Sequence, residues 1–408
     1  MRKTSTAPFA GKSISWVLKC VVLLLLTGSS SAQRADEWTM HRGDLLGSGR
    51  SGSKTDATEG KLAWEFLAQS RITVSPVVKD GVLYIGDWKS VFYAIDAKTG
   101  KQIWSTAPRV SSKPAAPKST PDESIAPLLE GTSTESQQYY SFSNPCLDDH
   151  RVFAATQQGI VTAFERSTGK VVWEREFDAE IFSSIRIVDG RIIFGCNDNF
   201  LHCLNAETGE TVWAYAAADW IGATCVITRG GTIITPSHDK FLHKIDLETG
   251  ELIEKFDVGY RSTGTPCLYL GNVYFCATGR RFMCVDVRNG ATRWRHNATS
   301  THQQGVAFRD AKDRRIWVAI HRNVHCYDAI TGAEIWRFAM DSQSAMSPCL
   351  GPELLYIPDR DGLLYALDIE TGKERWRVTY GRGSWTNPVL VDGLVYMAGS
   401  AGRVSAFR

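Results

Sequence analysis

The stretch Gly362 to Trp376, with the sequence GLLYALDIETGKERW, carries the pattern that decides the fold. Residues 364–367 alternate as a β-strand with one buried face does. Asp368 then starts a turn that ends at Gly372, because an Asp carboxylate accepts backbone N–H bonds two or three residues on and Gly adopts the positive φ of a tight hairpin. A second strand runs through Trp376, whose large apolar surface suits packing of one sheet against its neighbour.

The same pattern recurs along the chain with a step of about 40 residues. The turn glycines are Gly100, Gly169, Gly209, Gly250, Gly290, Gly332 and Gly372, at steps of 69, 40, 41, 40, 42 and 40 residues. Four residues after each glycine stands Trp104, Trp173, Trp213, Trp294, Trp336 or Trp376, with Glu254 the one exception. Four residues before each stands Asp96, Glu165, Asn205, Asp246, Asp286, Asp328 or Asp368. Three positions that recur together identify a repeat array.

An eighth copy is divided between the two ends of the chain. The segment from Asn387 to Arg408 holds three strands of a unit but stops before the turn and the Trp, and Gly60 to Trp64 supplies the missing strand. Pairing the first strand into the last blade closes a ring and removes the free sheet edge. We therefore predict an all-β fold, an eight-bladed β-propeller of four-stranded antiparallel blades that is closed by the N-terminal strand.

The N-terminus has a different composition. Basic residues precede the apolar run Val21 to Leu26, and small residues follow at positions 30–32. This order predicts a secretory signal peptide over residues 1–32. We expect a periplasmic or secreted protein with no transmembrane segment after signal cleavage.

The remaining chain divides into a short lead-in and the propeller. Residues 33–59 form the lead-in, which has no strand pattern, and residues 60–408 form the propeller. Residues 108–138 are rich in Pro, Ser, Lys and Glu, which predicts a flexible insertion. The tripeptide Arg42-Gly43-Asp44 suggests cell adhesion, but we favour a lead-in that packs Trp38 on the propeller.

Charge and cysteine content narrow the class of protein. Without residues 1–32, Lys plus Arg falls from 46 to 42 against 44 Asp plus Glu, so there is no bulk electrostatic footprint for nucleic acid. Cys203, Cys284 and Cys326 occupy a repeat position that is Ala in other copies. Residues that exchange with Ala are small buried hydrophobes, so we expect buried thiols rather than a disulfide framework. We also expect a monomer.

The signature Ala-Ile/Leu-Asp-Xaa-Xaa-Thr-Gly-Xaa-Xaa-Xaa-Trp resembles the repeat of the pyrroloquinoline-quinone (PQQ)-like β-propeller family, from about Gly60 to Arg408. This family includes calcium- and PQQ-dependent alcohol and sugar dehydrogenases, and also non-catalytic outer-membrane barrel-assembly propellers. The dehydrogenases are longer and carry a disulfide between adjacent cysteines beside the quinone. This sequence has no adjacent cysteines and no matching metal or catalytic-acid motif, so the resemblance transfers no catalytic or metal-binding residue.

Propellers bind ligands at the mouth of the central channel, where the loops that enter the inner strands converge. In this sequence the predicted ligand-binding residues of those loops are Arg71, Trp220, Arg261, His302, Gln303, Arg382 and Trp385. The arginines offer paired donors to a carboxylate, and the tryptophans offer stacking surfaces. Alternatively, these residues are exposed singly or pack under neighbouring loops. No nucleophile or carboxylate accompanies His302, so we predict no catalytic residue.

Three functions remain open. The first is an exported, non-enzymatic scaffold that binds a protein or peptide, in cell-envelope or outer-membrane protein assembly, without a cofactor. The alternative is a quinoprotein-like oxidoreductase that uses PQQ and calcium, which the repeat family and the channel-mouth arginines and tryptophans favour. The third is a carbohydrate-binding propeller with Trp220 and Trp385 as platforms.

Overall fold

The computed structural model describes residues 34, 37–107, 142–262, 264–278, 281–297, 305–309, 312–344, 346–381 and 386–408. The predicted signal peptide and the predicted insertion lie outside these residues, so both stay predictions. All the regular structure of the described part is β-strand, and that part has no helix able to cross a membrane.

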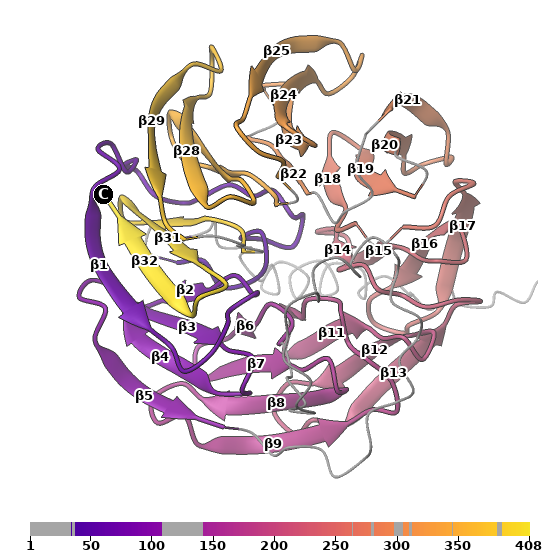
Figure 1. Cartoon of the computed structure of the whole chain (residues 1–408). Coiled ribbons are helices and arrows are strands. Elements are labelled where there is room, and N and C mark those ends of the chain that lie inside the picture. Colours follow the sequence, from indigo (N-terminus) through magenta and orange to yellow (C-terminus); the bar gives the residue numbers. More distant parts are fainter. Residues whose placement is uncertain are drawn as a thin grey trace, which may run out of the picture. The chain divides into compact units, whose positions relative to one another are not determined.

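The strands form eight separate sheets of four antiparallel strands, arranged as blades around a ring (Figure 1). Blades one to four contain β2 (Val77–Lys79), β3 (Val82–Gly86), β4 (Phe92–Asp96), β5 (Gln102–Thr106); β6 (Cys146–Leu147), β7 (Arg151–Ala155), β8 (Ile160–Glu165), β9 (Val171–Glu176); β10 (Arg186–Val188), β11 (Arg191–Gly195), β12 (Phe200–Asn205), β13 (Thr211–Ala216); β14 (Val226–Ile227), β15 (Thr232–Pro236), β16 (Phe241–Asp246) and β17 (Leu252–Asp257). Blades five to eight contain β18 (Cys267–Tyr269), β19 (Asn272–Ala277), β20 (Arg281–Asp286), β21 (Thr292–Asn297); β22 (Val306–Ala307), β23 (Arg315–Ile320), β24 (Asn323–Asp328), β25 (Glu334–Ala339); β26 (Cys349–Leu350), β27 (Leu354–Pro358), β28 (Leu363–Asp368), β29 (Glu374–Thr379); β30 (Val389–Val391), β31 (Leu394–Ala398), β32 (Arg403–Phe407) and β1 (Leu62–Leu67).

The ring closes as the sequence predicts. The outer strand of blade eight is β1, which pairs antiparallel with β32 and places Trp64 opposite Ala406. Figure 1 shows the two strands side by side, one at each end of the colour scale. The predicted fold, eight four-stranded blades closed by the N-terminal strand, is therefore confirmed.

Each repeat tryptophan packs on the turn glycine of the next blade. A Cβ on Gly250 would lie 2.5 Å from the indole of Trp213, and the indole Nε1 of Trp213 donates to the carbonyl of Leu247 at 3.0 Å. The same contact recurs around the ring, and Trp376 makes it with Gly60 at the closure. Where Glu254 replaces the Trp, Phe256 supplies the ring that covers Gly290. Gly and Trp therefore recur together because each pair forms one interface between blades.

The turn aspartates cap the hairpins as predicted. Asp96 Oδ1 accepts the backbone N–H groups of Lys98 at 3.1 Å and Thr99 at 2.8 Å, and also the Thr99 hydroxyl at 2.7 Å. The following glycine, Gly100, has φ of 72°, which only Gly adopts at low cost. Each turn is thus fixed by residues within five positions of one another.

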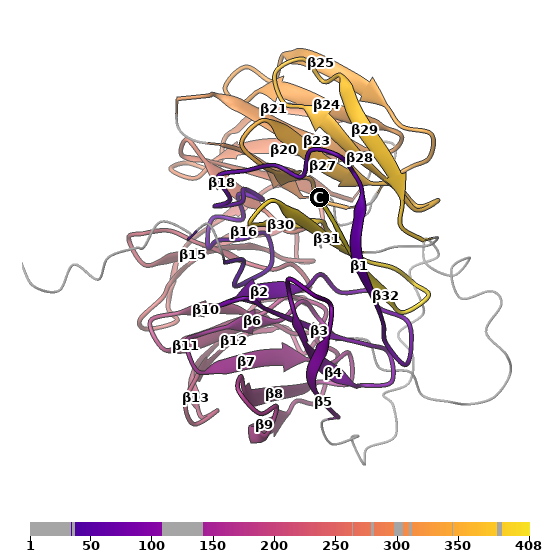
Figure 2. The same ribbon diagram turned by 90° about the vertical axis from the view of Figure 1, so that its left-hand side faces the viewer.

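The lead-in has no regular strand, but it is integral to the ring. It runs along the inner side of the blades (Figures 1 and 2), and its hydrogen bonds reach successive blades in chain order. Backbone bonds join it to the inner strands or the residue beside them at Trp38–Val78, Thr39–Leu147, Leu45–Ile227, Leu46–Leu268, Ser48–Phe308 and Gly49–Leu350. Side-chain bonds join the lead-in to the two remaining blades: Arg186 of blade three donates to His41 O, and Ser51 donates to Leu390 O of blade eight.

The core lies between the blades, and the thiols belong to it. All nine cysteines of the described part are free and buried. Burial raises the pKa of Cys203 and Cys326 to about 12, because the thiolate loses its hydration. These cysteines behave as the small hydrophobes that their exchange with Ala predicts.

Candidate functional site

The three described residues of the predicted channel-mouth set occupy one repeat position in different blades. Their carbonyls accept bonds from the turn between the second and third strands of the same blade, in the pairs Arg71–Trp88 (2.9 Å), Trp220–His238 (3.0 Å) and Arg261–Thr278 (2.8 Å). Strand topology thus places these residues on the same face, the face where the inner strands begin.

Their described side-chain contacts are local. The guanidinium of Arg71 lies 5.5 Å from the ring centroid of Trp88, and the rings of Trp220 and His238 are 4.1 Å apart. Both contacts join an entry loop to a turn of its own blade. His302, Gln303, Arg382 and Trp385 lie outside the described residues, so a shared pocket stays a prediction.

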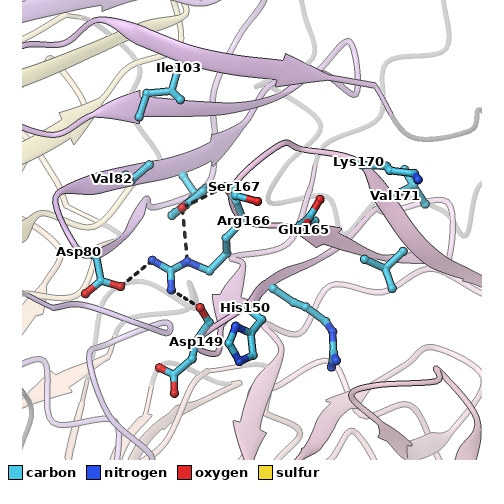
Figure 3. A pocket seen from close by; sticks show the side chains of 13 residues that line it. Asp80, Val82, Ile103, Asp149, His150, Glu165, Arg166, Ser167, Lys170 and Val171 are labelled. Carbon is cyan, nitrogen blue, oxygen red and sulfur yellow. Dashed lines mark hydrogen bonds and ion pairs between the residues drawn. The ribbon is translucent and has the colours of Figure 1, made fainter.

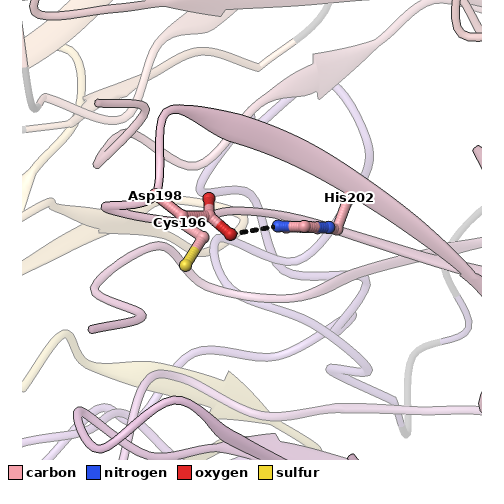
Figure 4. Close-up of side chains that lie close together, drawn as sticks. All are labelled: Cys196, Asp198 and His202. Atoms are coloured by element: carbon pink, nitrogen blue, oxygen red, sulfur yellow. Dashed lines mark hydrogen bonds and ion pairs between the residues drawn. The ribbon is translucent and has the colours of Figure 1, made fainter. Parts of the chain in front are cut away.

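A thiol, a carboxylate and an imidazole meet at the turn between β11 and β12 (Figure 4). The ligand atoms of Cys196, Asp198 and His202 lie within 4.8 Å of one another, and His202 Nε2 is 2.8 Å from Asp198 Oδ2. Burial raises the pKa of the Cys196 thiol to about 12, which disfavours the thiolate that a metal requires.

The next blade repeats this arrangement without the thiol. There Ser237 replaces the cysteine, and His243 Nε2 lies 3.0 Å from Asp239 Oδ1. Because the Asp–His bond forms in both blades, it is explained as the bond that holds the turn. The imidazole nitrogen near the thiol in Figure 4 is already engaged by Asp198.

A hollow of about 900 Å³ lies between blades one and two, on the face that carries the turn between β8 and β9 (Figure 3). It is lined by Asp80, Val82, Tyr84, Ile103, Asp149, His150, Arg151, Glu165, Arg166, Ser167, Lys170, Val171 and Val172. We call it the blade 1–2 groove. Its lining combines both signs of charge with aliphatic side chains, which suits a polypeptide better than a small apolar ligand.

Arg166 ties the two walls of the groove together. Its guanidinium donates to Asp80 Oδ2 at 2.9 Å in blade one and to the carbonyl of Asp149 at 2.8 Å in blade two. It also lies over the Tyr84 ring at 5.7 Å. Burial acts to lower the pKa of Arg166, but hydrogen bonds to Tyr84 and Asp80 outweigh burial and raise it. The floor of the groove is therefore a fixed cation.

Two outer strands give the groove an apolar rim. Ile103 of β5 is 51% exposed and Val172 of β9 is 49% exposed, although both are large aliphatic residues. The carboxylate of Asp149 and the carboxylate of Asp80 are also exposed, at 78% and 51%. The same outer-strand position is similarly exposed in other blades, as in Val212 at 43% and Ile335 at 49%, so the charged floor is what distinguishes this groove.

Our sequence reasoning missed this groove, although one signal was present. Arg166 occupies a repeat position that is otherwise small or aliphatic, as in Ala97, Ala206, Leu247, Val287, Ala329 and Ile369. A single arginine in an apolar column marks a blade boundary that differs from the others.

The fold and the repeat define the class of this protein: an eight-bladed PQQ-like β-propeller. A family model described as outer membrane protein assembly factor BamB matches residues 140–311 and 320–408. The chain belongs to this family. A second model, for the β-propeller domain of glucose, ethanol and alcohol dehydrogenases, matches residues 36–172.

Individual relatives agree with both models. The chain is 20% identical to outer membrane protein assembly factor BamB of Shewanella oneidensis over 363 residues, covering 82% of this chain and 84% of that protein. The crystal structure of BamB from Moraxella catarrhalis superposes with a TM-score of 0.65 at 15% identity, over 85% of this chain and 97% of that one. Quinohemoprotein alcohol dehydrogenase from Comamonas testosteroni gives 0.71 at 15% identity, over 93% and 81%.

The one cluster of three ligand side chains in the described ranges does not suit the calcium of the dehydrogenases. Within the described ranges, the one group of three His, Cys, Asp or Glu ligands is Cys196, Asp198 and His202, and calcium prefers oxygen ligands to a thiol or an imidazole. The disulfide between adjacent cysteines that the dehydrogenases carry has no counterpart in the sequence. The absence of a cofactor stays a prediction.

Proposed function

We propose that this chain is an exported, non-enzymatic propeller that binds a protein or peptide partner during outer-membrane protein assembly. Membership of the BamB family supports the process. The observation that carries the proposal is the blade 1–2 groove, in which the exposed aliphatic residues Ile103 and Val172 flank a fixed, charged floor. We expect the protein to act as a monomer in the periplasm.

The groove suits an extended segment of a partner chain. Its rim residues lie on β5 and β9, which are outer strands with one unpaired edge each. An added segment would gain apolar contacts with Ile103 and Val172, and its charged side chains would meet Asp80, Asp149 or Lys170. Arg166 needs no rearrangement on binding, because its donors already hold the two walls together.

The test uses site-specific photo-crosslinking in an envelope extract. A photoreactive residue replaces Val172, and the matched control replaces Val212, which has the same repeat position on β13, is 43% exposed and is not part of the groove lining. We expect a reproducible crosslinked partner from position 172 and none from position 212. Equal yields at both positions, or none at either, contradict the proposal.

The dehydrogenase match to residues 36–172 favours a quinoprotein as the second candidate function. Calcium with PQQ would then raise the melting temperature saturably and support dye reduction with simple alcohols or aldose sugars, because a ligand that binds the folded state stabilises it. The second candidate is rejected if neither a shift nor turnover appears.

A further inference from the structure

Two arginines lie deep on the inner side of the ring, where the lead-in meets the inner strands. Arg186 of β10 is 0% exposed and Arg42 of the lead-in is 2% exposed, and His41 beside them is 7% exposed. The tripeptide that suggested adhesion is thus held inside the ring by Arg42, which makes an adhesion role incompatible with this conformation.

The bonds of these arginines go to backbone carbonyls. Arg186 Nη1 donates to His41 O at 2.6 Å and to Asp44 O at 2.9 Å, and its Nε donates to Cys225 O at 3.0 Å. Arg42 Nη1 has only long contacts, of 3.4 Å to Thr265 O and 3.5 Å to Pro266 O. Carbonyls satisfy donors, but they do not neutralise two buried positive charges.

Several donors remain without a hydrogen-bond acceptor among the described residues. They are Arg42 Nε, Arg42 Nη2 and Arg186 Nη2, and His41 Nδ1 is likewise unpaired. Nε and Nη2 together form one edge of the guanidinium, and this is an edge that binds two oxygens of a carboxylate or phosphate at once. Both donors of this edge of Arg42 are thus buried and unpaired.

The guanidinium groups of Arg42 and Arg186 both lie near Gly47 and the Pro266 carbonyl. Pro266 O is 3.5 Å from Arg42 Nη1, and a Cβ on Gly47 would lie 2.9 Å from Pro266 O and 3.6 Å from Arg186 Nη2. Burial, with a smaller contribution from the charge of Arg186, lowers the pKa of Arg42 to about 10. Burial also lowers the pKa of His41, followed by the charges of Arg186 and Arg42.

The nearest carboxylate in sequence is committed to other bonds. Asp44 Oδ1 accepts the backbone N–H groups of Leu46 and Ser48, both at 3.0 Å, and its Oδ2 accepts the Ser48 hydroxyl at 2.5 Å. Asp44 acts electrostatically on both arginines, but no ion pair within the described ranges joins it to either. Asp44 supplies one negative charge near two buried arginines, and its oxygens are occupied by its own turn, so positive charge is in excess there.

We propose that the inner side of the ring holds a small oxyanion, of the carboxylate, sulfate or phosphate class, on the free edge of Arg42 and the free Nη2 of Arg186. The anion supplies the missing acceptors and offsets the buried charge. It thereby fastens the lead-in, which carries Arg42, to blade three, which carries Arg186.

Gly305 fixes the position of the Arg42 side chain. A Cβ there would lie 2.6 Å from both Cζ and Nη1 of Arg42, so a larger residue displaces the guanidinium. This packing holds the free edge in place before the anion binds, and a preorganised donor pair binds more tightly than a flexible one.

The first experiment is a thermal-shift titration of the purified protein with formate, acetate, sulfate, phosphate and chloride at constant ionic strength. We expect a saturable rise in melting temperature with at least one oxyanion and less with chloride. Arg42→Gln should abolish that rise. Arg50→Gln is the matched control and should keep it, since Arg50 is an exposed lead-in arginine whose Nη1 donates to Arg309 O at 2.8 Å.

The variants also separate binding from general salt effects, because sulfate and phosphate stabilise many proteins by exclusion from the surface. A rise of equal size in wild type and Arg42→Gln overturns the proposal. A rise with acetate or formate alone identifies a carboxylate ligand, and a rise with sulfate or phosphate alone identifies a tetrahedral one.

A second measurement does not depend on the stability of any variant. Crystals of the wild-type protein grown with selenate should give an anomalous difference peak within hydrogen-bonding distance of Arg42 Nε and Nη2. Density for water alone at this position, after growth in saturating selenate and in saturating formate, overturns the proposal.

Discussion

The contact between tryptophan and glycine around the ring makes a sharp prediction for Gly250→Ala. The added methyl would lie 2.5 Å from the Trp213 indole, which is closer than Cβ atoms approach other atoms, and Trp213 is only 9% exposed. Gly250 also has φ of 72°, so the substitution adds backbone strain. We expect a loss of about 1–2 kcal/mol from strain and about 1–3 kcal/mol more from overpacking.

Gly190→Ala is the matched control for this change. Gly190 has φ of 70°, and a Cβ there has no atom within 4 Å, so the control carries the strain without the clash. Urea unfolding followed by intrinsic fluorescence gives the free energy of unfolding of both variants. Equal losses for the two variants would refute the interpretation that the glycine is required by the tryptophan of the preceding blade.

A double-mutant cycle separates the free energy of the clash from that of the backbone strain. Trp213→Leu removes the indole that meets the new methyl, so Gly250→Ala should cost less in that background than in wild type. The difference measures the clash itself. A cost that is unchanged by Trp213→Leu would place the destabilisation in the backbone alone.

Three further predictions follow from closure, titration and thiol burial. Trp376→Ala should lower the free energy of unfolding by about 3–5 kcal/mol, because Trp376 packs on Gly60 and donates to Ala57 O at 2.9 Å where the ring closes. In the same unfolding assay the control Ile335→Ala, at a residue 49% exposed, should lower it by under 1 kcal/mol. Burial lowers the pKa of His41 in the folded protein, so the unfolded chain binds a proton first as the pH falls below about 6.5. The free energy of unfolding should therefore decrease by up to about 1.4 kcal/mol per pH unit between pH 6.5 and 5. The decrease should be less steep in His41→Gln. The nine buried cysteines should not react with Ellman's reagent in the native protein and should all react in guanidinium, and rapid native labelling would contradict their burial.

Residues close together in the sequence fixed what could be predicted of the fold. The three recurring positions, mostly Asp, Gly and Trp, lie within nine residues in each repeat, so the turn and its cap are local, and the 40-residue period counts the blades. The divided eighth repeat predicted the closure, because strand β1 carries the motif that the last blade lacks. Even the partner of the Trp was present in the sequence, as the glycine that recurs with it.

The candidate sites were less accessible to sequence reasoning. Arg71, Trp220 and Arg261 do share one repeat position, but their described contacts are with the turns of their own blades, which spacing alone does not reveal. The blade 1–2 groove depends on Arg166, which departs from the repeat rather than following it. A search for what repeats is blind to such a residue.

The sequence by itself determined the blades, their number and the way in which they close, because these depend on short-range turns and a regular period. Only the tertiary structure decided the course of the lead-in, which has no period and is held mainly by backbone bonds to successive inner strands. Those bonds bring Arg42 within electrostatic range of Arg186, 144 positions away in the chain. Two buried cations with free donors result from that path. The sequence does not reveal the path, because hydrogen bonds between distant backbone groups leave no pattern in the side chains.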